Sequence, residues 1–508
     1  MSDIAMLEKM SNTIRFLSAD MVQKANSGHP GMPMGMADVL TVFSSHFKHN
    51  PKNPKWLNRD RVVFSGGHGS ALIYSMLFAW GYNISLDDLK EFRQLGSKTP
   101  GHPEVTHTDG IEVTTGPLGQ GVANAVGFAM ASKHASALLN SDTAKIIDHK
   151  VYCFCGDGDL EEGISYEACS LAGHLGLDNL VLIYDSNNIT IEGDTSIALS
   201  EDIKKRFEAQ KWEAIEINGH DFEAIDSAFI KAKSQTKPLL IIAKTAIGKG
   251  AATMEGSHET HGAPLGNDEI AKSKQKCGFN NEPFFIPEDA LVRFRCAVEK
   301  GDLYEREWKK LISEAPLLEQ NTALERILNP DLGSIKFPEF KVGESFATRD
   351  TNGMILNAIA KALPNFIGGS ADLAPSNKTE LKNMGDFPKG KNIHFGIREH
   401  SMAAITNGIA QYGLFMPFCA TFFIFSDYLK PAARVAALMK AKLFYIFTHD
   451  SIGVGEDGAT HQPIEQLSTF RALPNFYTFR PADGIENVEN WKIALSLQAP
   501  SAFVLSRQ

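Results

Sequence analysis

The pattern of apolar positions predicts a strand, a helix and a second strand in succession in the first half of the chain. Short β-rich apolar runs at 150–155 and 179–185 flank residues 164–177, where apolar side chains recur at helical spacing. Two strands joined through a helix in this way form a βαβ unit, and the strands of such a unit are parallel. Two further apolar runs, at 214–217 and 238–245, predict additional strands.

A second α/β pattern follows in the last third of the chain. Five apolar runs, each leading into a loop, accompany a helical pattern at 351–363 and begin near residues 365, 392, 414, 442 and 475. A polar stretch with several prolines, about 280–345, separates the two patterns and is typical of a linker with some helix. We therefore predict an α/β protein with two domains, 1–320 and 346–508, joined by a linker at 321–345, each domain having a mostly parallel sheet flanked by helices.

Composition and charge exclude several classes of protein. The 508 residues carry 50 Lys and Arg against 60 Asp and Glu, a formal net charge of −10, so the surface as a whole repels nucleic acid and anionic lipid. No run approaches the roughly 18 consecutive apolar residues that span a bilayer, and the N-terminal segment lacks the basic-then-apolar order of a signal peptide. The six cysteines form no C-x-x-C pair, which favours free buried thiols. We expect a cytoplasmic enzyme with no nucleic-acid or membrane partner.

Two short polar motifs follow neighbouring strands of the predicted βαβ unit. Gly156-Asp157-Gly158 comes after the first strand, and Asn187-Asn188 after the second. Parallel sheets bind ligands outside the carboxyl ends of their strands, and Asp and Asn oxygens suit Mg²⁺ or Ca²⁺ better than zinc. The glycines let a phosphate group approach the backbone. Alone these residues could be plain turn residues, but their spacing predicts a phosphate or diphosphate held through a divalent cation.

Histidines are unusually frequent in glycine-, proline- or aspartate-containing loops. Imidazoles in such loops are expected to hydrogen-bond a polyhydroxylated substrate and to transfer protons near neutral pH. The segment 258–261 is not a zinc motif, because only two residues separate its histidines. The loop histidines are His29, His68, His102, His258, His261, His449 and His461.

A glycine motif at 453–458 matches the dinucleotide-binding pattern G-x-G-x-x-G. Pro463 stands where the following helix should continue, and the acidic pair Glu456-Asp457 would repel a pyrophosphate. The sequence therefore disfavours an NAD site here.

The GDG…NN spacing is a fingerprint of thiamine diphosphate enzymes, and with it the chain resembles the transketolase family through nearly its whole length. Ten motifs occur in the family's order: SGHPGMPMGMAD, GGHGS, KTPGHPE, TTGPLGQG, GDGDLEEG, HGAPLG, GGSADLAPSN, REHSM, THDSIGVGEDGATHQP and the final LSRQ. The resemblance implies two thiamine diphosphate-binding-type domains, one for the diphosphate and one for the pyrimidine. It also implies transfer of a two-carbon ketol unit from a ketose phosphate to an aldose phosphate, through a carbanion formed on the cofactor, in the pentose phosphate pathway.

The same resemblance implies roles for individual residues. Mg²⁺ or Ca²⁺ would be held by Asp157, Asn187 and the Ile189 carbonyl. Cofactor contacts are implied for His68, Gly116, Pro117, Leu118, Gly158, Glu162, Asn187, His261, Asp372, Phe422, Phe425 and Tyr428. Catalytic roles are implied for Glu399, His29, His102, His261 and His461. Substrate contacts are implied for His29, Arg349, Ser376, His449, Asp457, His461 and Arg507.

Among these residues, Glu399 looks like the glutamate that shares a proton with the aminopyrimidine ring, and Phe425 like the side chain that stacks on it. Glu162 resembles the glutamate that links paired active sites. Family members are homodimers with active sites at the subunit interface, and the same assembly is expected here. The chain stops at LSRQ, where family members continue into a third domain, so that domain is expected to be absent.

Other functions remain open at this stage. Dihydroxyacetone synthase and deoxyxylulose phosphate synthase are related thiamine enzymes with similar motifs. A chain that binds the cofactor without turnover is a further alternative, because family members have a third domain that is expected to be absent here.

Overall fold

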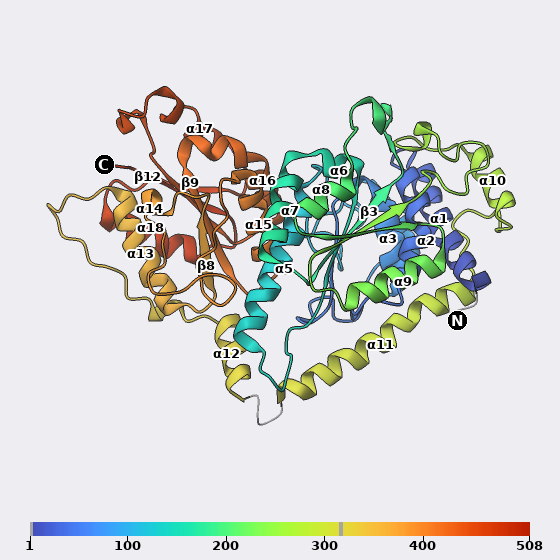
Figure 1. The fold of residues 1–508 in the computed structure, drawn as a ribbon, viewed down its shortest axis with the longest axis horizontal. Coiled ribbons are helices and arrows are strands. Elements are labelled where there is room, and N and C mark those ends of the chain that lie inside the picture. Colours follow the sequence, from blue (N-terminus) through green and yellow to red (C-terminus); the bar gives the residue numbers. More distant parts are fainter. Residues whose placement is uncertain (1–3, 314–317) are drawn as a thin grey trace. The chain divides into compact units, whose positions relative to one another are not determined.

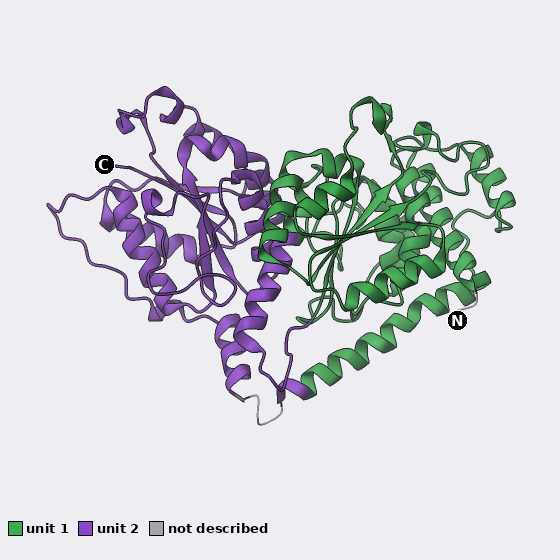
Figure 2. Ribbon diagram, viewed as in Figure 1, with its two compact units in different colours: residues 1–125, 149–310 green, residues 126–148, 311–508 purple. Residues whose placement is uncertain are grey.

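The structure, a computed structural model, describes residues 4–313 and 318–508 and forms two compact units (Figures 1 and 2). Unit 1 comprises residues 1–125 and 149–310, and unit 2 comprises residues 126–148 and 311–508. Each unit has a five-stranded sheet with helices around it, as the apolar pattern predicts. Residues 314–317 of the expected linker stretch lie outside the described residues.

The sheet of unit 1 is parallel, with the strand order β1-β2-β3-β7-β6. Four of its strands correspond to predicted runs, and β1 is additional, because four residues carry little periodicity. A short antiparallel pair, β4 (Ile189–Thr190) and β5 (Gly193–Asp194), follows β3. The strands of the sheet are β1 (Arg61–Phe64), β2 (Val151–Gly156), β3 (Leu180–Ser186), β6 (Glu213–Asn218) and β7 (Leu239–Lys244).

Helices account for most of the remaining described chain in unit 1. The GDG motif contains the start of a helix, because Asp157 is the first residue of α6. Helix α5 (Gln120–Leu139) crosses the sequence boundary between the units. The other helices are α1 (Ile4–Ala25), α2 (Gly31–Phe43), α3 (Ser70–Trp80), α4 (Leu86–Lys90), α6 (Asp157–Glu161), α7 (Gly163–Leu175), α8 (Ile203–Ala209), α9 (Phe222–Lys233), α10 (Asn267–Lys276) and α11 (Glu288–Ser313).

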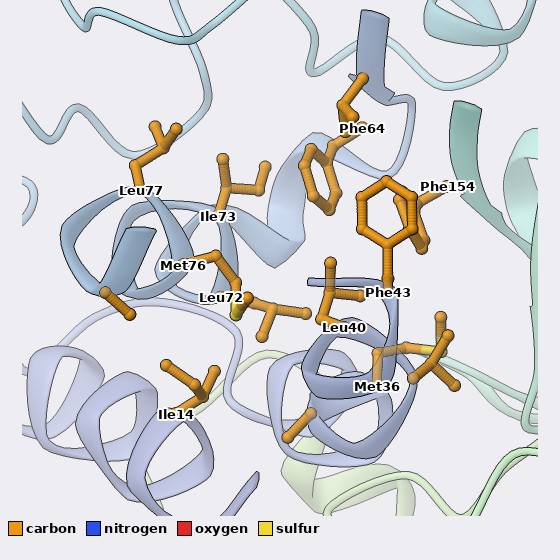
Figure 3. Close-up of a cluster of buried hydrophobic side chains, with 14 of the residues drawn as sticks. Ile14, Met36, Leu40, Phe43, Phe64, Leu72, Ile73, Met76, Leu77 and Phe154 are labelled. Atoms are coloured by element: carbon orange, nitrogen blue, oxygen red, sulfur yellow. The ribbon is translucent and has the colours of Figure 1, made fainter. Parts of the chain in front are cut away.

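A cluster of buried apolar side chains packs α1, α2 and α3 against the sheet of unit 1 (Figure 3). Leu40 and Phe43 of α2 meet strand residues Phe64 and Phe154, and the rings of Phe43 and Phe154 lie 5.4 Å apart. Large aromatic side chains contribute most to such a core because each buries a large apolar area. This packing fixes α2, whose N-terminal end follows the loop that carries His29.

The sheet of unit 2 is also parallel, with the order β11-β12-β10-β9-β8. Trp491 stacks on Phe503 at 4.2 Å in its core. The strands are β8 (Phe366–Ser370), β9 (Met416–Phe422), β10 (Phe444–Thr448), β11 (Tyr477–Phe479) and β12 (Ser501–Leu505). The helices are α12 (Leu318–Leu328), α13 (Thr348–Ala362), α14 (Ala374–Asn377), α15 (Glu399–Gln411), α16 (Ser426–Met439), α17 (Gln466–Arg471) and α18 (Gly484–Ser496).

The prediction of a strand that begins near residue 392 is wrong. The segment meets β8 through an isolated bridge between Asn392 and Gly368, after which the chain leaves the sheet edge. Gly396 then takes a φ of +68°, a conformation that a strand does not contain, before Glu399 begins α15. Apolar composition alone does not distinguish such an edge segment from a strand.

Two further expectations concern loops and cysteines. The glycine motif at 453–458 overlaps one short 3-10 turn, Ile452–Val454, and is followed by another, Ala459–His461, instead of the helix that a dinucleotide site requires. All six cysteines are free, as predicted, although Cys277 and Cys296 are only partly buried. Within the described residues, no helix has the length and apolar character needed to cross a bilayer. The predicted domain limits remain a prediction.

Candidate functional site

A cavity of about 400 Å³ in unit 1 opens at the carboxyl ends of β2 and β3. A volume of this size accommodates a cofactor or a small substrate. Ile247, from the segment after β7, also lines it. Nine residues predicted from the sequence line the cavity: His29, His68, Gly116, Leu118, Asp157, Gly158, Asn187, Ile189 and His261.

Asp157 is the most unusual side chain of this cavity. It is 4% exposed, its Oδ1 accepts a hydrogen bond from the Tyr184 hydroxyl, and its Oδ2 is buried without a partner. Burial, opposed by the hydrogen bond from Tyr184, raises the pKa of Asp157 to about 6. A buried carboxylate oxygen of this kind is costly unless a cation or donor reaches it.

Asn187 is held in place by its neighbours along β3 and the next loop. Its Nδ2 donates to Asp185 Oδ2 at 2.9 Å, and its Oδ1 accepts from the Ile189 N–H at 2.9 Å. Asn188 has a φ of +61°, so the chain turns sharply between the two predicted ligands. Burial raises the pKa of Asp185 to about 7, and Thr245 donates a hydrogen bond to its other oxygen.

These residues fit a hard divalent cation bound together with phosphate oxygens. Asp157 supplies an unpartnered carboxylate oxygen, and Asn187 supplies an amide oxygen with a second lone pair. No group of three or more His, Cys, Asp or Glu side chains among the described residues is arranged to hold a metal ion by itself. A cation here therefore needs the amide, a backbone carbonyl and a ligand's own oxygens.

Space for a phosphate comes from glycines on facing loops. A Cβ at Gly158 would lie 2.9 Å from Leu118 Cδ1, so any larger residue would fill this part of the cavity. Gly116 has a φ of +148°, a conformation that residues with side chains rarely adopt. Both observations fit a backbone that approaches a ligand closely.

Four predicted histidines form one cluster in unit 1. The ring centroid of His29 lies 5.4 Å from that of His68, 6.2 Å from that of His102 and 5.8 Å from that of His261. Burial, with a smaller effect of Arg93, lowers the pKa of His29 to about 4, and burial lowers that of His68 to about 3. Burial also lowers the pKa of His102 and of His261. The cluster is therefore neutral at pH 7 and offers both donors and acceptors.

The remaining predicted residues of unit 1 lie around this cavity without lining it. His102 does not line the cavity itself, but its ring is next to that of His29, which does. Pro117 lies in the loop between Gly116 and Leu118, two residues that line the cavity. Glu162 is exposed at the start of α7. His258, one of the loop histidines, is exposed and stays outside the cluster.

Aromatic side chains gather with two histidines in unit 2. The ring of His449 stacks on Phe422 at 3.7 Å, and the ring of His461 meets Phe425 edge-on at 5.3 Å. Phe425 in turn lies 6.2 Å from Tyr428, which is 64% exposed. Burial, with Arg349 and Arg507 nearby, lowers the pKa of His449 to about 4. This cluster offers an apolar platform with the neutral ring of His449 and the ring of His461 beside it.

Two arginines lie beside His449. Arg349 donates from Nη1 to the Ser376 carbonyl at 3.1 Å, while its Nε is buried without a partner. Arg507 pairs through Nη2 with Glu456 Oε1 at 2.5 Å. Arginine pairs bidentately with phosphate, so these groups fit an anionic ligand. Asp457, next to Glu456, is exposed and acts electrostatically on His449.

Two predicted residues of unit 2 are placed at element boundaries. Glu399 is the half-buried first residue of α15, where the helix dipole favours a carboxylate. Asp372 follows β8 with a φ of +62° and is exposed. It lines a smaller cavity of about 270 Å³ with Ser370 and Pro375.

Several site residues are absent from the sequence prediction. Asp159 is fully buried and accepts hydrogen bonds from Ser65 Oγ and from the N–H groups of Gly119 and Gly156. It thereby joins the glycine loop at 116–119 to the end of β2. Asp159 is the second acidic residue of the GDGDLEEG motif, but nothing in the sequence identifies its partners.

Two family models match the chain. The model described as the transketolase thiamine diphosphate binding domain matches residues 6–330, and the model described as the transketolase pyrimidine binding domain matches residues 344–508. Among curated relatives, a transketolase of Halalkalibacterium halodurans is 49% identical over 98% of this chain and 77% of its own length. A Bacillus subtilis transketolase is also 49% identical, over 99% and 78%.

Solved structures give the same result. A Campylobacter jejuni transketolase is 66% identical, with a TM-score of 0.97, and the match covers 100% of this chain and 79% of that one. A Pichia stipitis transketolase in complex with sedoheptulose 7-phosphate is 43% identical, with a TM-score of 0.96, over 99% and 78% of the two chains.

Proposed function

The chain belongs to the transketolase family, and on that premise we propose how its residues carry out the transfer of a two-carbon ketol unit between sugar phosphates. The observation that carries the proposal is the cavity of unit 1, which brings Asp157, Asn187 and neutral histidines together. Thiamine diphosphate, when bound, supplies a carbon nucleophile and an electron sink for the two-carbon unit. The chain's residues bind it, orient the substrates and move protons.

Asp157, Asn187 and the Ile189 carbonyl would hold Mg²⁺ or Ca²⁺ together with the diphosphate. The unpartnered Oδ2 of Asp157 supports this role, since a cation would satisfy it and favour its charged form. The glycines at 116 and 158 would let the diphosphate lie against the backbone. Pro117, Leu118, His68 and Glu162 would complete this half of the site.

The histidine cluster would bind sugar hydroxyls and move protons. Neutral imidazoles both donate and accept, so His29, His102 and His261 can each hydrogen-bond a hydroxyl and exchange its proton. Their lowered pKa values keep them neutral under physiological conditions. His461 of unit 2 would also contact the substrate and take part in proton transfer.

Unit 2 would bind the pyrimidine ring of the cofactor. Phe425, Phe422 and Tyr428 provide an aromatic surface on which a flat heterocycle can stack. Glu399 would hydrogen-bond this ring and hold the proton that it shares with it. Asp372 is a further candidate contact on this side.

The phosphate of the sugar would be bound by Arg349, Ser376, His449 and Arg507. Asp457 would contact the hydroxyls of the sugar. The proximity of two arginines to His449 supports this assignment, because their charges create a local positive potential on an acidic protein. The Pichia stipitis relatives were crystallised with sedoheptulose 7-phosphate, xylulose 5-phosphate and fructose 6-phosphate. We infer the same class of substrate for this chain.

The diphosphate half and the pyrimidine half of a complete site would come from different subunits of a homodimer. Ile191 at the unit 1 cavity and Tyr428 in the aromatic cluster of unit 2 are exposed apolar side chains, which favours burial of these two surfaces by a second copy. A cytoplasmic location and a role in the pentose phosphate pathway are part of the same proposal.

A coupled assay tests this function. The purified protein with thiamine diphosphate and Mg²⁺ should convert xylulose 5-phosphate and ribose 5-phosphate into a seven-carbon and a three-carbon sugar phosphate. Pyruvate as donor or formaldehyde as acceptor should give little product, and faster turnover with either would assign the chain to another thiamine reaction. Omission of the divalent cation after chelation should abolish turnover.

A further inference from the structure

The turn after β7, residues 245–248, lies beside the unit 1 cavity and contacts two segments, the one that carries Asn187 and the start of α2. Thr245 donates from its hydroxyl to Asp185, whose other oxygen orients Asn187. Ile247 is 1% exposed and lines the cavity itself. The turn is therefore in contact with the Asn187 segment on one side.

On its other side the turn packs against the start of α2. The Gly248 N–H donates to the Gly31 carbonyl at 2.9 Å, and a Cβ at Gly31 would lie only 2.6 Å from Ile247 Cγ1. A Cβ at Gly35 would lie 2.9 Å from the Ala246 carbonyl oxygen. Gly31 follows His29 by two residues, so the turn also supports the histidine cluster.

A partly buried histidine, whose side chain is 18% exposed, contacts the backbone of this turn from outside the cavity. His220, in the loop between β6 and α9, accepts a hydrogen bond at Nε2 from the Ala246 N–H at 2.9 Å. Because Nε2 accepts, the proton of the neutral ring is on Nδ1, which donates to Asp38 Oδ2 at 2.8 Å.

Asp38 is itself fixed by a third group. It is 6% exposed, and Arg15 donates from Nη2 to its Oδ1 at 2.8 Å. Arg15 also donates from Nε to the Met34 carbonyl at 3.2 Å, so it is hydrogen-bonded to two residues of α2, Met34 and Asp38. Arg15, Asp38 and His220 thus form a continuous chain of hydrogen bonds that ends at the backbone of the turn.

We propose that His220, oriented by Asp38, is a positioning residue that fixes the turn at 245–248 and thereby keeps the cofactor cavity ready to bind. His220 lines neither the cavity nor the histidine cluster, so it acts through Ala246 and the turn. Polar groups behind a binding site set the orientation of the groups that touch the ligand, and their loss weakens binding. The inference rests on the proposed function, since it assumes that this cavity receives the cofactor.

Two variants of His220 and one variant of a control histidine distinguish a positioning role from a general effect on stability. His220→Asn keeps a polar group near Asp38 but is too short to reach the Ala246 N–H, whereas His220→Gln can reach it. His46→Asn is the matched control, because His46 also pairs with an aspartate, Asp226, at 2.7 Å in unit 1 and lies away from the cavity.

Two measurements apply to all four proteins. The first is hydrogen exchange of the apoprotein, read by mass spectrometry in peptides covering 244–250. The second is titration of the apoprotein with thiamine diphosphate at saturating Mg²⁺. For His220→Asn we expect about tenfold faster exchange in these peptides and about tenfold weaker cofactor binding, because the partly buried Ala246 N–H loses its acceptor. His220→Gln should recover most of both, and His46→Asn should match the wild type.

The outcomes separate the inference from the function on which it rests. If His220→Asn binds the cofactor as tightly as His46→Asn, the positioning role is wrong, whether or not exchange increases. If weaker binding occurs without faster exchange at 244–250, the proposed route through the turn is wrong. Failure of the wild type to bind thiamine diphosphate would instead reject the proposed function of the cavity.

Discussion

The hydroxyl of Tyr184 donates a hydrogen bond to Oδ1 of Asp157 and leaves Oδ2 of the same carboxylate buried without a partner. Burial is the main reason why the pKa of Asp157 is raised to about 6. The apoprotein therefore holds a carboxylate whose charged form is disfavoured, in a cavity that fits a cation. Stability without ligand and affinity for the ligand should respond to this residue in opposite directions.

Asp157→Asn should stabilise the apoprotein and remove its response to the cofactor. Because the pKa is about 6 in the folded chain and 3.8 ordinarily, the folded state binds more protons between these values. The free energy of unfolding therefore decreases as pH rises through this window, and the cost persists above pH 6. Removing the charge should recover up to about 3 kcal/mol at pH 7.5 in urea denaturation.

The same variant should lose the rise in melting temperature that thiamine diphosphate and Mg²⁺ give the wild type. Glu161→Gln is the control, because Glu161 is an exposed carboxylate of the same cavity. A ligand response in Asp157→Asn equal to that of the control would contradict the metal assignment.

The histidine cluster predicts a second pH dependence, with the opposite sign. Burial lowers the pKa of His68 to about 3, so in the folded chain this ring stays neutral where the unfolded chain is protonated. Between pH 6.5 and about 3 the unfolded state binds more protons, and stability is lost as the pH falls. Each such histidine steepens the slope by about 1.4 kcal/mol per pH unit.

His68→Gln should reduce that slope by about one proton between pH 4.5 and 6, measured by urea denaturation of the apoprotein. Exposed His107 provides the control, and His107→Gln should leave the slope unchanged. Equal slopes for the two variants would show that His68 is not buried as a neutral ring.

The sequence predicts the placement of Asp157 and Asn187 because parallel strands bring their carboxyl ends to one edge. It does not predict Tyr184 or Asp185 as their partners, since both belong to a buried apolar strand and their contacts depend on the facing strand β7 and on α6. The histidine loops are recognisable as motifs, yet the neutral state of the rings follows from burial alone. The segment at 392–397 fails as a strand because its backbone conformation, set by Gly396, does not follow from its apolar composition.

The phosphate assignment predicts a selective effect of Arg349. Arg349→Ala should raise KM for xylulose 5-phosphate by about 10- to 100-fold, the value of a charge-assisted hydrogen bond, with a much smaller effect on an unphosphorylated ketose donor. Steady-state kinetics with both donors measures this. Arg326→Ala, in α12, is a matched control that should change neither KM. Equal increases for both donors in Arg349→Ala would remove this residue from the phosphate site.

Glu456 should compete with the substrate phosphate for Arg507. The pair is exposed, so its contribution is small and decreases with salt. Glu456→Gln should lower KM for phosphorylated donors by about two- to fivefold at low ionic strength, and the difference from wild type should vanish in 0.5 M salt. An increase in KM would mean that Glu456 helps to bind substrate instead.

A mixing experiment tests whether one site uses unit 1 of one subunit and unit 2 of the other. Asp157→Ala and Glu399→Ala should each be inactive as homodimers, because the first lacks a metal ligand and the second the proton partner of the pyrimidine. When the two chains are refolded together, about half of the dimers are mixed, and each mixed dimer has one site with both halves intact. Activity should therefore return to about one quarter of the wild-type value. Mixing Asp157→Ala with Asn187→Ala, two variants of unit 1, should restore nothing, since every site then has a defective unit 1. Recovery in that control, or none in the first mixture, would contradict a site shared between subunits.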